Sequence, residues 1–324
     1  MADFAIEFSD VEAAASRIRE HIVWTPALSP PEINHQAGAE LHFKCENFQH
    51  VGAFKARGAC NAVFSLNEKD GRAGVVTHSS GNHAAALARA ARLRGIDAYI
   101  VMPRNSAAVK LAAVRKLGVK PVFSESDSAS RQAVANRVQQ ETGATFIHPF
   151  DNPSVMAGQG TAAMELFHDA PKLDALVVPV GGGGLLSGSL VVARHLAPDV
   201  PVYAAEPVWA DDCYRSLQTG KIEIPERYDT IADGLRTPLG QLTFPIVRSL
   251  LKEVLLVTEE QIRGATLSLM QQGRMIVEPS GAVPLAAVLA NPQLFRGRRV
   301  GLIISGGNID PATLQEIVSS DRSV

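Results

Sequence analysis

Apolar and polar residues along the chain alternate in a way that predicts short strands separated by helices. After Gly74, β-rich runs at 75–77 and 98–102 are each followed by a helical pattern, at 84–93 and 107–117. Parallel strands need a crossover connection of this kind, so the pattern is typical of βαβ units. The fold class that it predicts is α/β.

The same pattern predicts two domains. We expect residues 73–150 to form a small inserted α/β domain. A second set of strands follows it, with apolar runs at 175–180 and 300–304. We expect the large domain to be discontinuous, with residues 1–72 packing onto residues 151–324.

Two local patterns predict helix starts in the first seventy residues. Ser9-Asp10-Val11-Glu12 predicts a capping box, in which the Ser9 hydroxyl and the Glu12 carboxylate bond to free backbone amides. Apolar residues then recur at helical spacing, as in a packing helix. Further along, the pattern predicts a helix over 59–66, which would leave Lys55 in the loop before it.

Composition and charge exclude several classes of partner. The chain has 324 residues, of which 46% are hydrophobic and 20% are charged, as in an ordinary globular protein. A net charge of −2 without any Lys/Arg-rich run argues against a nucleic-acid partner. Three cysteines without paired spacing favour a reducing compartment. The apolar stretch 175–193 is interrupted by Pro179 and four glycines, and the N-terminus lacks a secretory signal pattern. We therefore expect a cytoplasmic protein without a membrane partner.

Lys55 is the first candidate for chemistry. It stands between Phe54 and Ala56, with Gly52 and Gly58 on either side. A lysine in such a segment is most often a solvated loop charge, because an unpaired ammonium is costly to bury. Alternatively, it is a partly desolvated amine with a lowered pKa that can form a Schiff base with a carbonyl cofactor. The segment alone fits both.

Four consecutive glycines, 181–184, lie between a predicted strand and a predicted helix. Bare backbone amides at a helix start can approach a phosphate, and the helix dipole favours the anion. A dinucleotide fingerprint would need a third glycine where Leu186 or Ser187 stands, and a P-loop would need Gly-Lys-Ser/Thr. A tight turn would need only one or two glycines. A single phosphate group therefore fits this loop best.

Two further loops follow predicted strands. Ser79-Ser80-Gly81-Asn82-His83 leads into a helix and, on its own, is a capping sequence. Ser305-Gly306-Gly307-Asn308 comes at the carboxyl end of a strand, where open α/β sheets bind ligands. Sequence alone would make Ser305 a turn residue.

Acidic residues at 206–212 admit two interpretations. Carboxylates with a backbone carbonyl suit Mg²⁺ or Ca²⁺. Acidic residues at the positive end of a helix dipole are the simpler explanation. His78, His83 and His148 match no zinc spacing, so we expect core or loop histidines, with His83 as a possible exception in the substrate pocket.

Taken together, the segments 44–58, 79–83, 181–184 and 305–308 resemble the fold-type-II pyridoxal-phosphate enzymes, specifically the serine/threonine dehydratase and serine racemase family. Their order and spacing are those of the family, and the resemblance runs from Thr25 to Asp310. It implies a tryptophan synthase β-like fold, with two doubly wound α/β domains and pyridoxal 5′-phosphate between them. It also implies a homodimer.

The resemblance assigns a role to each candidate residue. Lys55 would hold the cofactor and act in catalysis together with Ser80. The cofactor-binding residues would be Phe54, Lys55, Asn82, Gly181, Gly182, Gly183, Gly184, Leu185 and Ser305. The substrate-binding residues would be Ser79, Ser80, Gly81, Asn82, His83 and Arg131. The ligands of a divalent cation (Mg²⁺, Ca²⁺ or Mn²⁺) would be Glu206, the Ala210 carbonyl and Asp212.

The predicted function is that of a pyridoxal-phosphate-dependent dehydratase, an ammonia-lyase. It would convert a β-hydroxy amino acid of the L-serine, L-threonine or 3-hydroxyaspartate type to a 2-oxo acid and ammonia by β-elimination. The neutral Ser305 hydroxyl, which in the family faces the pyridine nitrogen, suits prompt loss of a β-leaving group. The alternative is a serine racemase with side dehydratase activity. A binding module without catalysis would be marked by loss of Lys55, which is present.

Overall fold

The computed structural model describes residues 4–79, 81–106, 108–170 and 172–320. Its strands form a six-stranded sheet in the order β1-β2-β10-β7-β8-β9 and a four-stranded sheet in the order β5-β4-β3-β6. Within the described residues, β1 and β2 pair antiparallel and the other strand pairs are parallel. The predicted α/β class is confirmed.

The strands of the large sheet are β1 (Ala27–Leu28), β2 (Glu40–Cys45), β7 (Ala175–Pro179), β8 (Val202–Pro207), β9 (Glu253–Val257) and β10 (Arg299–Ile304). Those of the small sheet are β3 (Val75–His78), β4 (Ala98–Pro103), β5 (Val122–Ser124) and β6 (Thr145–Phe146). The longer helices are α1 (Phe8–Ile18), α3 (Lys55–Ser65), α5 (Asn82–Arg94), α6 (Ala108–Lys116), α7 (Ser128–Thr142), α8 (Pro153–Asp169), α9 (Gly184–Leu196), α10 (Asp212–Thr219), α11 (Thr243–Leu250), α12 (Glu259–Gln271), α13 (Pro279–Ala290) and α15 (Pro311–Ser320). The shorter ones are α2 (Pro31–Ala37), α4 (Glu68–Arg72), α14 (Pro292–Phe295) and the 3₁₀ turns η1 (Glu46–Phe48), η2 (His50–Gly52), η3 (Val208–Ala210) and η4 (Asp233–Leu235).

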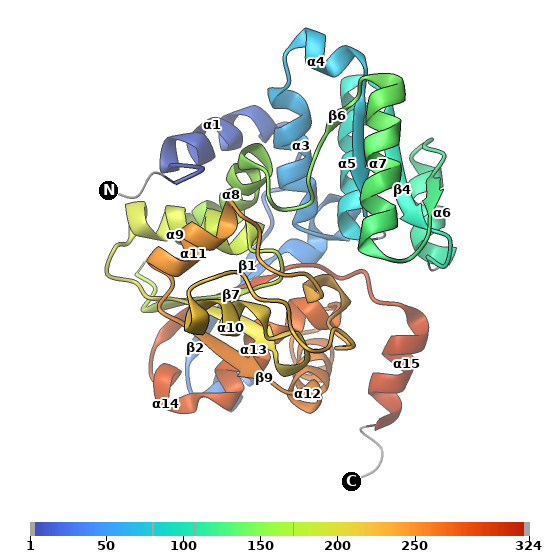
Figure 1. Ribbon diagram of the computed structural model, residues 1–324. Helices are drawn as coiled ribbons and strands as arrows, with labels where there is room; N and C mark the ends of the chain where they lie inside the picture. Colours follow the sequence, from blue (N-terminus) through green and yellow to red (C-terminus); the bar gives the residue numbers. More distant parts are fainter. Residues whose placement is uncertain (1–3, 80, 107, 171, 321–324) are drawn as a thin grey trace.

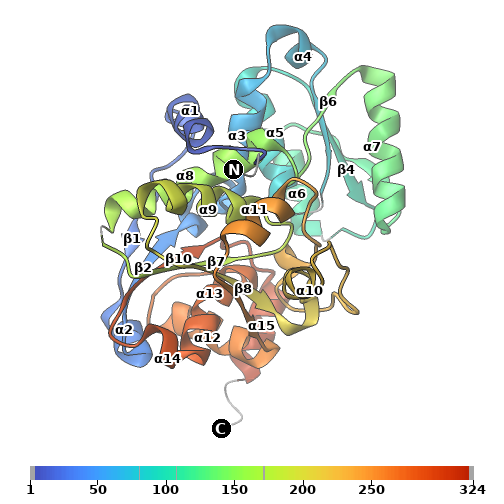
Figure 2. The same ribbon diagram turned by 60° about the vertical axis from the view of Figure 1, so that its left-hand side comes forward.

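Helices cover both faces of each sheet, as apolar strands require. In the large sheet, Val177 packs with α12 and α13, whereas its neighbours Leu176 and Val178 pack with α8 and α9. Figure 2 shows α8, α9 and α11 above this sheet and α12, α13 and α14 below it. In the small sheet, Val75 packs with α3 and α5, and Val76 packs with α7.

Strands from both ends of the chain share the large sheet, since β2 lies beside β10. The small sheet uses only residues between Val75 and Phe146. The core packing does not stop at these limits, because Ala59 and Val63 of α3 lie in the same apolar cluster as Val75. Helix α3 also packs against α8, so it lies between the two sheets. The boundaries at 73 and 150 stay a prediction.

Two predicted helix starts were wrong. Helix α1 begins at Phe8, and the Glu7 N–H donates to Asp10 Oδ2 at 2.8 Å, so the capping box lies two residues before Ser9. Helix α3 begins at Lys55 itself and includes Gly58, a glycine that the prediction placed in the loop before the helix. It lies where α3 crosses α8, and a Cβ on Gly58 would come within 2.7 Å of the Val155 carbonyl oxygen.

Candidate active site

The lysine segment and the Ser305 turn are joined by backbone hydrogen bonds. The Phe54 N–H donates to the Ser305 carbonyl at 3.0 Å, and the Gly307 N–H donates to the Gly52 carbonyl at 2.9 Å. This contact follows from the topology, because β2 and β10 are parallel neighbours whose carboxyl ends lie at the same edge of the sheet. Lys55 and the buried Ser305 therefore belong to one site.

The Lys55 amine is partly buried at the first turn of α3. Its Nζ donates to the Pro149 carbonyl at 2.9 Å and lies 5.0 Å from the centroid of the Phe54 ring. Burial lowers the pKa of this amine to about 8, against the opposing effect of the Glu278 carboxylate. Of the two interpretations of Lys55, the structure supports the desolvated amine.

The glycine loop lies between β7 and α9, as predicted. Gly183 has a φ of +85°, and a Cβ there would lie 2.8 Å from Leu239 Cδ2. A Cβ on Gly182 would overlap the Phe150 ring, and one on Gly184 would lie 3.0 Å from the Phe150 carbonyl oxygen. In the described part of the chain no side chain caps the start of α9, so its first amides are free to bind an anion.

Phe150 also connects the glycine loop to Lys55. It packs on Gly182 and Gly184, and the residue before it, Pro149, accepts the hydrogen bond from the lysine amine. The glycine loop and the lysine amine thus both contact the segment Pro149-Phe150.

Asn82 is the first residue of α5. Its Nδ2 donates to the two carboxylate oxygens of Glu278 at 3.0 and 3.1 Å, and its Oδ1 accepts from Asn308 Nδ2 at 2.9 Å. In the same loop the Gly81 N–H donates to Ser79 Oγ at 3.3 Å. Ser80, the predicted second catalytic residue, lies outside the described residues.

Glu278 was missed by the sequence analysis, as was the helix α13 that it precedes. It is buried, and burial raises the pKa of its carboxyl to about 7. Its backbone N–H donates to the Gly306 carbonyl at 3.0 Å, so it is attached to the Ser305 turn. An acidic residue followed by Pro279 is a recognisable helix start, and this signal could have located it.

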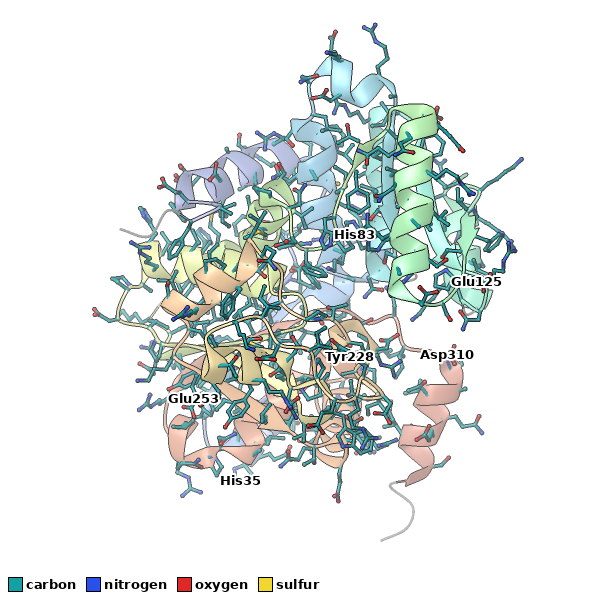
Figure 3. All side chains as sticks on the ribbon, in the orientation of Figure 1. His35, His83, Glu125, Tyr228, Glu253 and Asp310 are labelled. Atoms are coloured by element: carbon teal, nitrogen blue, oxygen red, sulfur yellow. The ribbon has the colours of Figure 1, made fainter. Side chains whose placement is uncertain are left out.

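Basic side chains gather near Lys55 on the side of the small sheet. The two ring nitrogens of His83 are buried without a hydrogen-bond partner in the described part of the chain, and Figure 3 labels this residue, which lies in the first turn of α5. Burial, followed by the Lys55 charge, holds the pKa of His83 well below its usual range. Burial lowers the pKa of His148 to about 4 and also lowers that of His78, which lies beside Arg131.

Arg131 is therefore part of this cluster, although sequence alone would make it a solvated charge. Its Nε is buried, and no residue that the structure describes accepts a hydrogen bond from it. A buried guanidinium N–H without an acceptor is costly, and an anionic ligand would satisfy it.

Glu206 and Asp212 come together at the carboxyl end of β8. Glu206 accepts from the Cys213 and Tyr214 amides at 2.8 and 2.9 Å. Both Asp212 oxygens are buried without a partner among the described residues. Burial raises the pKa of Asp212 to about 8, and burial together with Asp212 raises that of Glu206 well above its usual range.

Two facing carboxylates in the interior are the arrangement that a divalent cation would relieve. Within the described ranges no three His, Cys, Asp or Glu side chains are grouped as metal ligands, so a third ligand would have to be a carbonyl such as that of the buried Ala210.

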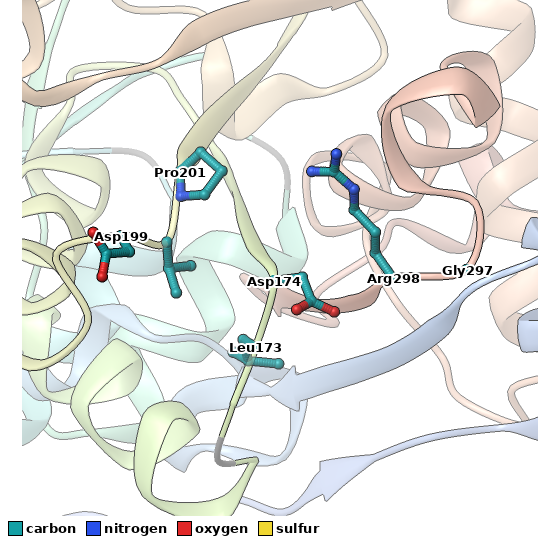
Figure 4. A pocket seen from close by; sticks show the side chains of 7 residues that line it. Leu173, Asp174, Asp199, Pro201, Gly297 and Arg298 are labelled. Carbon is teal, nitrogen blue, oxygen red and sulfur yellow. The ribbon is translucent and has the colours of Figure 1, made fainter.

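A surface hollow lies away from these residues. It has a volume of about 580 Å³ and is lined by residues that precede β7, β8 and β10, including Asp174, Pro201 and Arg298 (Figure 4). These residues lie at the amino ends of the strands, the sheet edge opposite Lys55 and the glycine loop. This hollow is not the candidate active site.

No helix within the described ranges is long and apolar enough to span a membrane.

Comparisons with known proteins agree with this geometry. The family model described as pyridoxal-phosphate dependent enzyme matches residues 18–306. A beta-hydroxyaspartate dehydratase of Paracoccus denitrificans is 46% identical over 303 residues, covering 94% of this chain and 96% of the relative. A serine racemase of Dictyostelium discoideum is 45% identical over 320 residues, covering 97% and 98%.

Solved structures are also similar to this chain. Maize serine racemase has a TM-score of 0.93 and 42% identity, with 98% of each chain covered. Threonine deaminase isoform 2 of Solanum lycopersicum, in its processed form, has a TM-score of 0.91 and 31% identity, covering 96% of this chain and 91% of that one. The chain therefore belongs to the pyridoxal-phosphate dependent enzymes, in the fold-type-II class that contains dehydratases and racemases.

Proposed function

We propose that this enzyme is primarily a dehydratase that converts a β-hydroxy amino acid to a 2-oxo acid and ammonia, and that 3-hydroxyaspartate is its best substrate. The observation that carries the proposal is the arrangement of the low-pKa Lys55 amine, the glycine loop and Arg131, whose Nε has no acceptor among the described residues.

The residues fit pyridoxal phosphate. A loop in which any Cβ would meet packed atoms, followed by an uncapped helix start, suits its phosphate through the amides of Gly181–Gly184 and Leu185. Lys55 would hold the aldehyde carbon, Asn82 would contact the ring oxygen, and Ser305 would face the ring nitrogen. Phe54 would pack beside them. When bound, the cofactor supplies an aldehyde that condenses with amines and an electron-poor ring that accepts the electron pair of the broken α-C–H bond.

Lys55 is the base in this proposal. Its amine takes the proton from the substrate α-carbon, which it can do near neutral pH because burial lowers its pKa to about 8. The amides and hydroxyls of Ser79, Gly81 and the residue between them bind the α-carboxylate at the start of α5. The β-hydroxyl leaves as water, and the released enamine hydrolyses to the 2-oxo acid and ammonia.

Arg131 supports the choice of 3-hydroxyaspartate. Serine and threonine carry one carboxylate, for which the start of α5 already provides a site. A second carboxylate on the substrate would accept from the buried Arg131 Nε, for which the described part of the chain provides no acceptor. His83 is held neutral by its low pKa and lies in the same cluster, where it can donate one N–H to this carboxylate.

The second candidate is racemisation of serine, which the similarity to several serine racemases supports. It needs a proton donor on the face opposite Lys55, and Ser80 is the residue we propose for it. Dehydration needs only the lysine face. We therefore expect racemisation to be the slower reaction.

The remaining parts of the proposal concern the assembly and the cation. Glu206, the Ala210 carbonyl and Asp212 bind Mg²⁺, Ca²⁺ or Mn²⁺, which the two buried carboxylates favour. The active form is a homodimer in the cytoplasm, by analogy with the family.

The test is a substrate panel of L-serine, L-threonine and the isomers of 3-hydroxyaspartate, assayed for 2-oxo acid. Arg131→Gln should lower kcat/KM for 3-hydroxyaspartate by about 10- to 150-fold, the loss expected when one charge-assisted hydrogen bond is removed. It should leave kcat/KM for serine within about threefold of the wild-type value. Arg137→Gln is the matched control, because Arg137 is exposed on the same helix. Equal losses for both substrates would refute the role of Arg131. Faster racemisation than dehydration, seen by chiral chromatography, would reverse the order of the two reactions.

A further inference from the structure

The Glu278 carboxyl lies where three segments of the active site meet. It contacts Asn82 through both oxygens, and its own backbone N–H bonds to Gly306 in the Ser305 turn. Asn308, at the end of that turn, donates from Nδ2 to Asn82 Oδ1 at 2.9 Å and to the Val51 carbonyl at 2.7 Å. Glu278 thus connects the asparagine loop, through its side chain, to the serine turn, through its backbone, and Asn308 connects both to Val51 in the lysine segment.

These contacts fix which way the Asn82 amide points. Its oxygen is taken by Asn308, which can only donate from Nδ2, and its nitrogen faces two acceptor oxygens. Turning the amide over would place its oxygen against the carboxylate and its nitrogen against the Asn308 amide nitrogen. Both contacts would then be repulsive, so the observed orientation is strongly preferred.

The geometry also leaves one Asn82 hydrogen for a ligand. The two oxygens of a carboxyl group lie too close together to accept both hydrogens of one amide nitrogen. Distances of 3.0 and 3.1 Å therefore describe a single N–H shared between them. The second N–H of Asn82 points in another direction and can donate to a ligand.

We propose that Glu278 is a positioning residue, which acts through Asn82 by holding its free N–H toward the ring oxygen of the bound cofactor. This inference rests on the proposed role of Asn82 in the site. Glu278 itself need not touch the cofactor. Without it, the Asn82 amide can rotate or flip, and the contact with the ring oxygen is lost for part of the time.

The close packing at this point supports a fixed role. A Cβ on Gly306 would lie 2.7 Å from Glu278 Oε1, so the turn passes directly over the carboxyl group. Glu278 is also the residue before the first turn of α13, a helix buried along most of its length, which keeps the side chain in place.

The experiment measures cofactor binding and needs no substrate, so its outcome is independent of which reaction the enzyme catalyses. Asn82→Ala, Glu278→Ala and the double variant are titrated with pyridoxal phosphate, and the dissociation constant and the visible absorption maximum are recorded. We expect each single variant to raise the dissociation constant at least tenfold and to shift the maximum in the same direction. The double variant should be no worse than Asn82→Ala within threefold, because the two residues act as one unit.

Glu278→Gln tests the hydrogen bond separately from the charge. Its amide oxygen can still accept from Asn82, so we expect its absorption maximum to stay that of the wild type and its dissociation constant to rise no more than threefold. Glu259→Ala is the matched control, because Glu259 is another buried glutamate at a helix start that accepts from the Ile231 amide at 2.7 Å. Thermal unfolding shows whether each variant is folded.

Multiplicative losses in the double variant would overturn the proposal, since independent effects indicate a general structural role for Glu278. Wild-type absorption and affinity in Glu278→Ala would overturn it as well. If Asn82→Ala alone binds the cofactor normally, the proposed role of Asn82 fails, and that result is separate from any failure of Glu278.

Discussion

The lowered pKa of Lys55 predicts how the enzyme without cofactor takes up pyridoxal phosphate at different pH values. Only the neutral amine can attack the aldehyde. At pH 7 an amine with a pKa of about 8 is about 9% neutral, whereas a lysine at its ordinary pKa of 10.5 is about 0.03% neutral. The uptake rate at pH 7 should therefore be roughly 300-fold higher than for a lysine with an unshifted pKa, other things being equal.

The assay is stopped-flow absorbance, with the apo-enzyme mixed with pyridoxal phosphate between pH 6.5 and pH 10. The rate should rise roughly eightfold from pH 6.5 to pH 7.5, reach half of its maximum near pH 8 and level off above about pH 9. Dividing by the rate constant of an α-blocked lysine, expressed per neutral ε-amine at the same pH, removes the titration of the cofactor itself and keeps that of Lys55. His83 and His148 stay neutral across this range because burial keeps the pKa of each low, so they contribute no charge.

A variant of Glu278 tests the direction in which this carboxylate shifts the pKa of Lys55. Its carboxylate raises the pKa of Lys55, so Glu278→Gln should move the midpoint of the uptake profile to lower pH. Lys55→Ala should show no uptake at this site and no visible band. A wild-type midpoint near 10.5 would show that the amine is solvated, and a shift to higher pH in Glu278→Gln would refute the electrostatic assignment.

Three further predictions concern the loop, the cation and the buried charges. Gly297→Ala should lose about 1–2 kcal/mol of stability, because its φ is positive and its Cβ would meet open space. Gly183→Ala should lose more than this, because its Cβ would also lie 2.8 Å from Leu239 Cδ2, and only this variant should weaken cofactor binding; equal affinities of the two variants by titration would count against the loop. Chelation with EDTA should lower the melting temperature, Mg²⁺ or Mn²⁺ should restore it, and Asp212→Ala should abolish this response. A wild-type melting temperature that EDTA does not change would contradict the cation site and favour the helix dipole as the reason for these acidic residues. Glu165→Gln should lower the free energy of unfolding by about 3–5 kcal/mol, because it leaves the buried Arg57 and Lys44 short of a carboxylate; a denaturant midpoint close to that of the wild type would refute this.

Much of the site could be predicted from the sequence because its residues lie in short motifs after strands. The glycine loop, Asn82 and Ser305 are all found at strand or helix ends, and parallel strands bring such ends together. The role of Lys55 was predicted from the resemblance that four segments carry together, although its place in the first turn of α3 was not. The misplaced helix start arose because a glycine required by helix packing looks the same in the sequence as a loop glycine.

Glu278 and Arg131 show what the sequence could not settle. The residue pair Glu278-Pro279 marks a helix start, but nothing local shows that Glu278 or Arg131 is a buried charge rather than a solvated one. The side-chain partner of Glu278 comes from a segment far away in the chain, because Asn82 is 196 residues from it. Only the meeting of α13, α5 and the Ser305 turn makes this glutamate part of the site.

The buried ion pairs that hold the start of α3 in place are the feature of the site that the sequence shows least. Arg57, two residues along α3, is fully buried and bonds to Glu46 and to Glu165 on α8, with Nη1 2.6 Å from Glu165 Oε1. A charged residue is normally expected at the surface, and burying it is costly unless its partners are all in place. They are in place because α3 and α8 approach closely at Gly58 and Gly158, where no Cβ separates the helices. The chemistry of Lys55 therefore follows from a local motif, but the position of its amine depends on ion pairs that exist only after α3 and α8 have packed together.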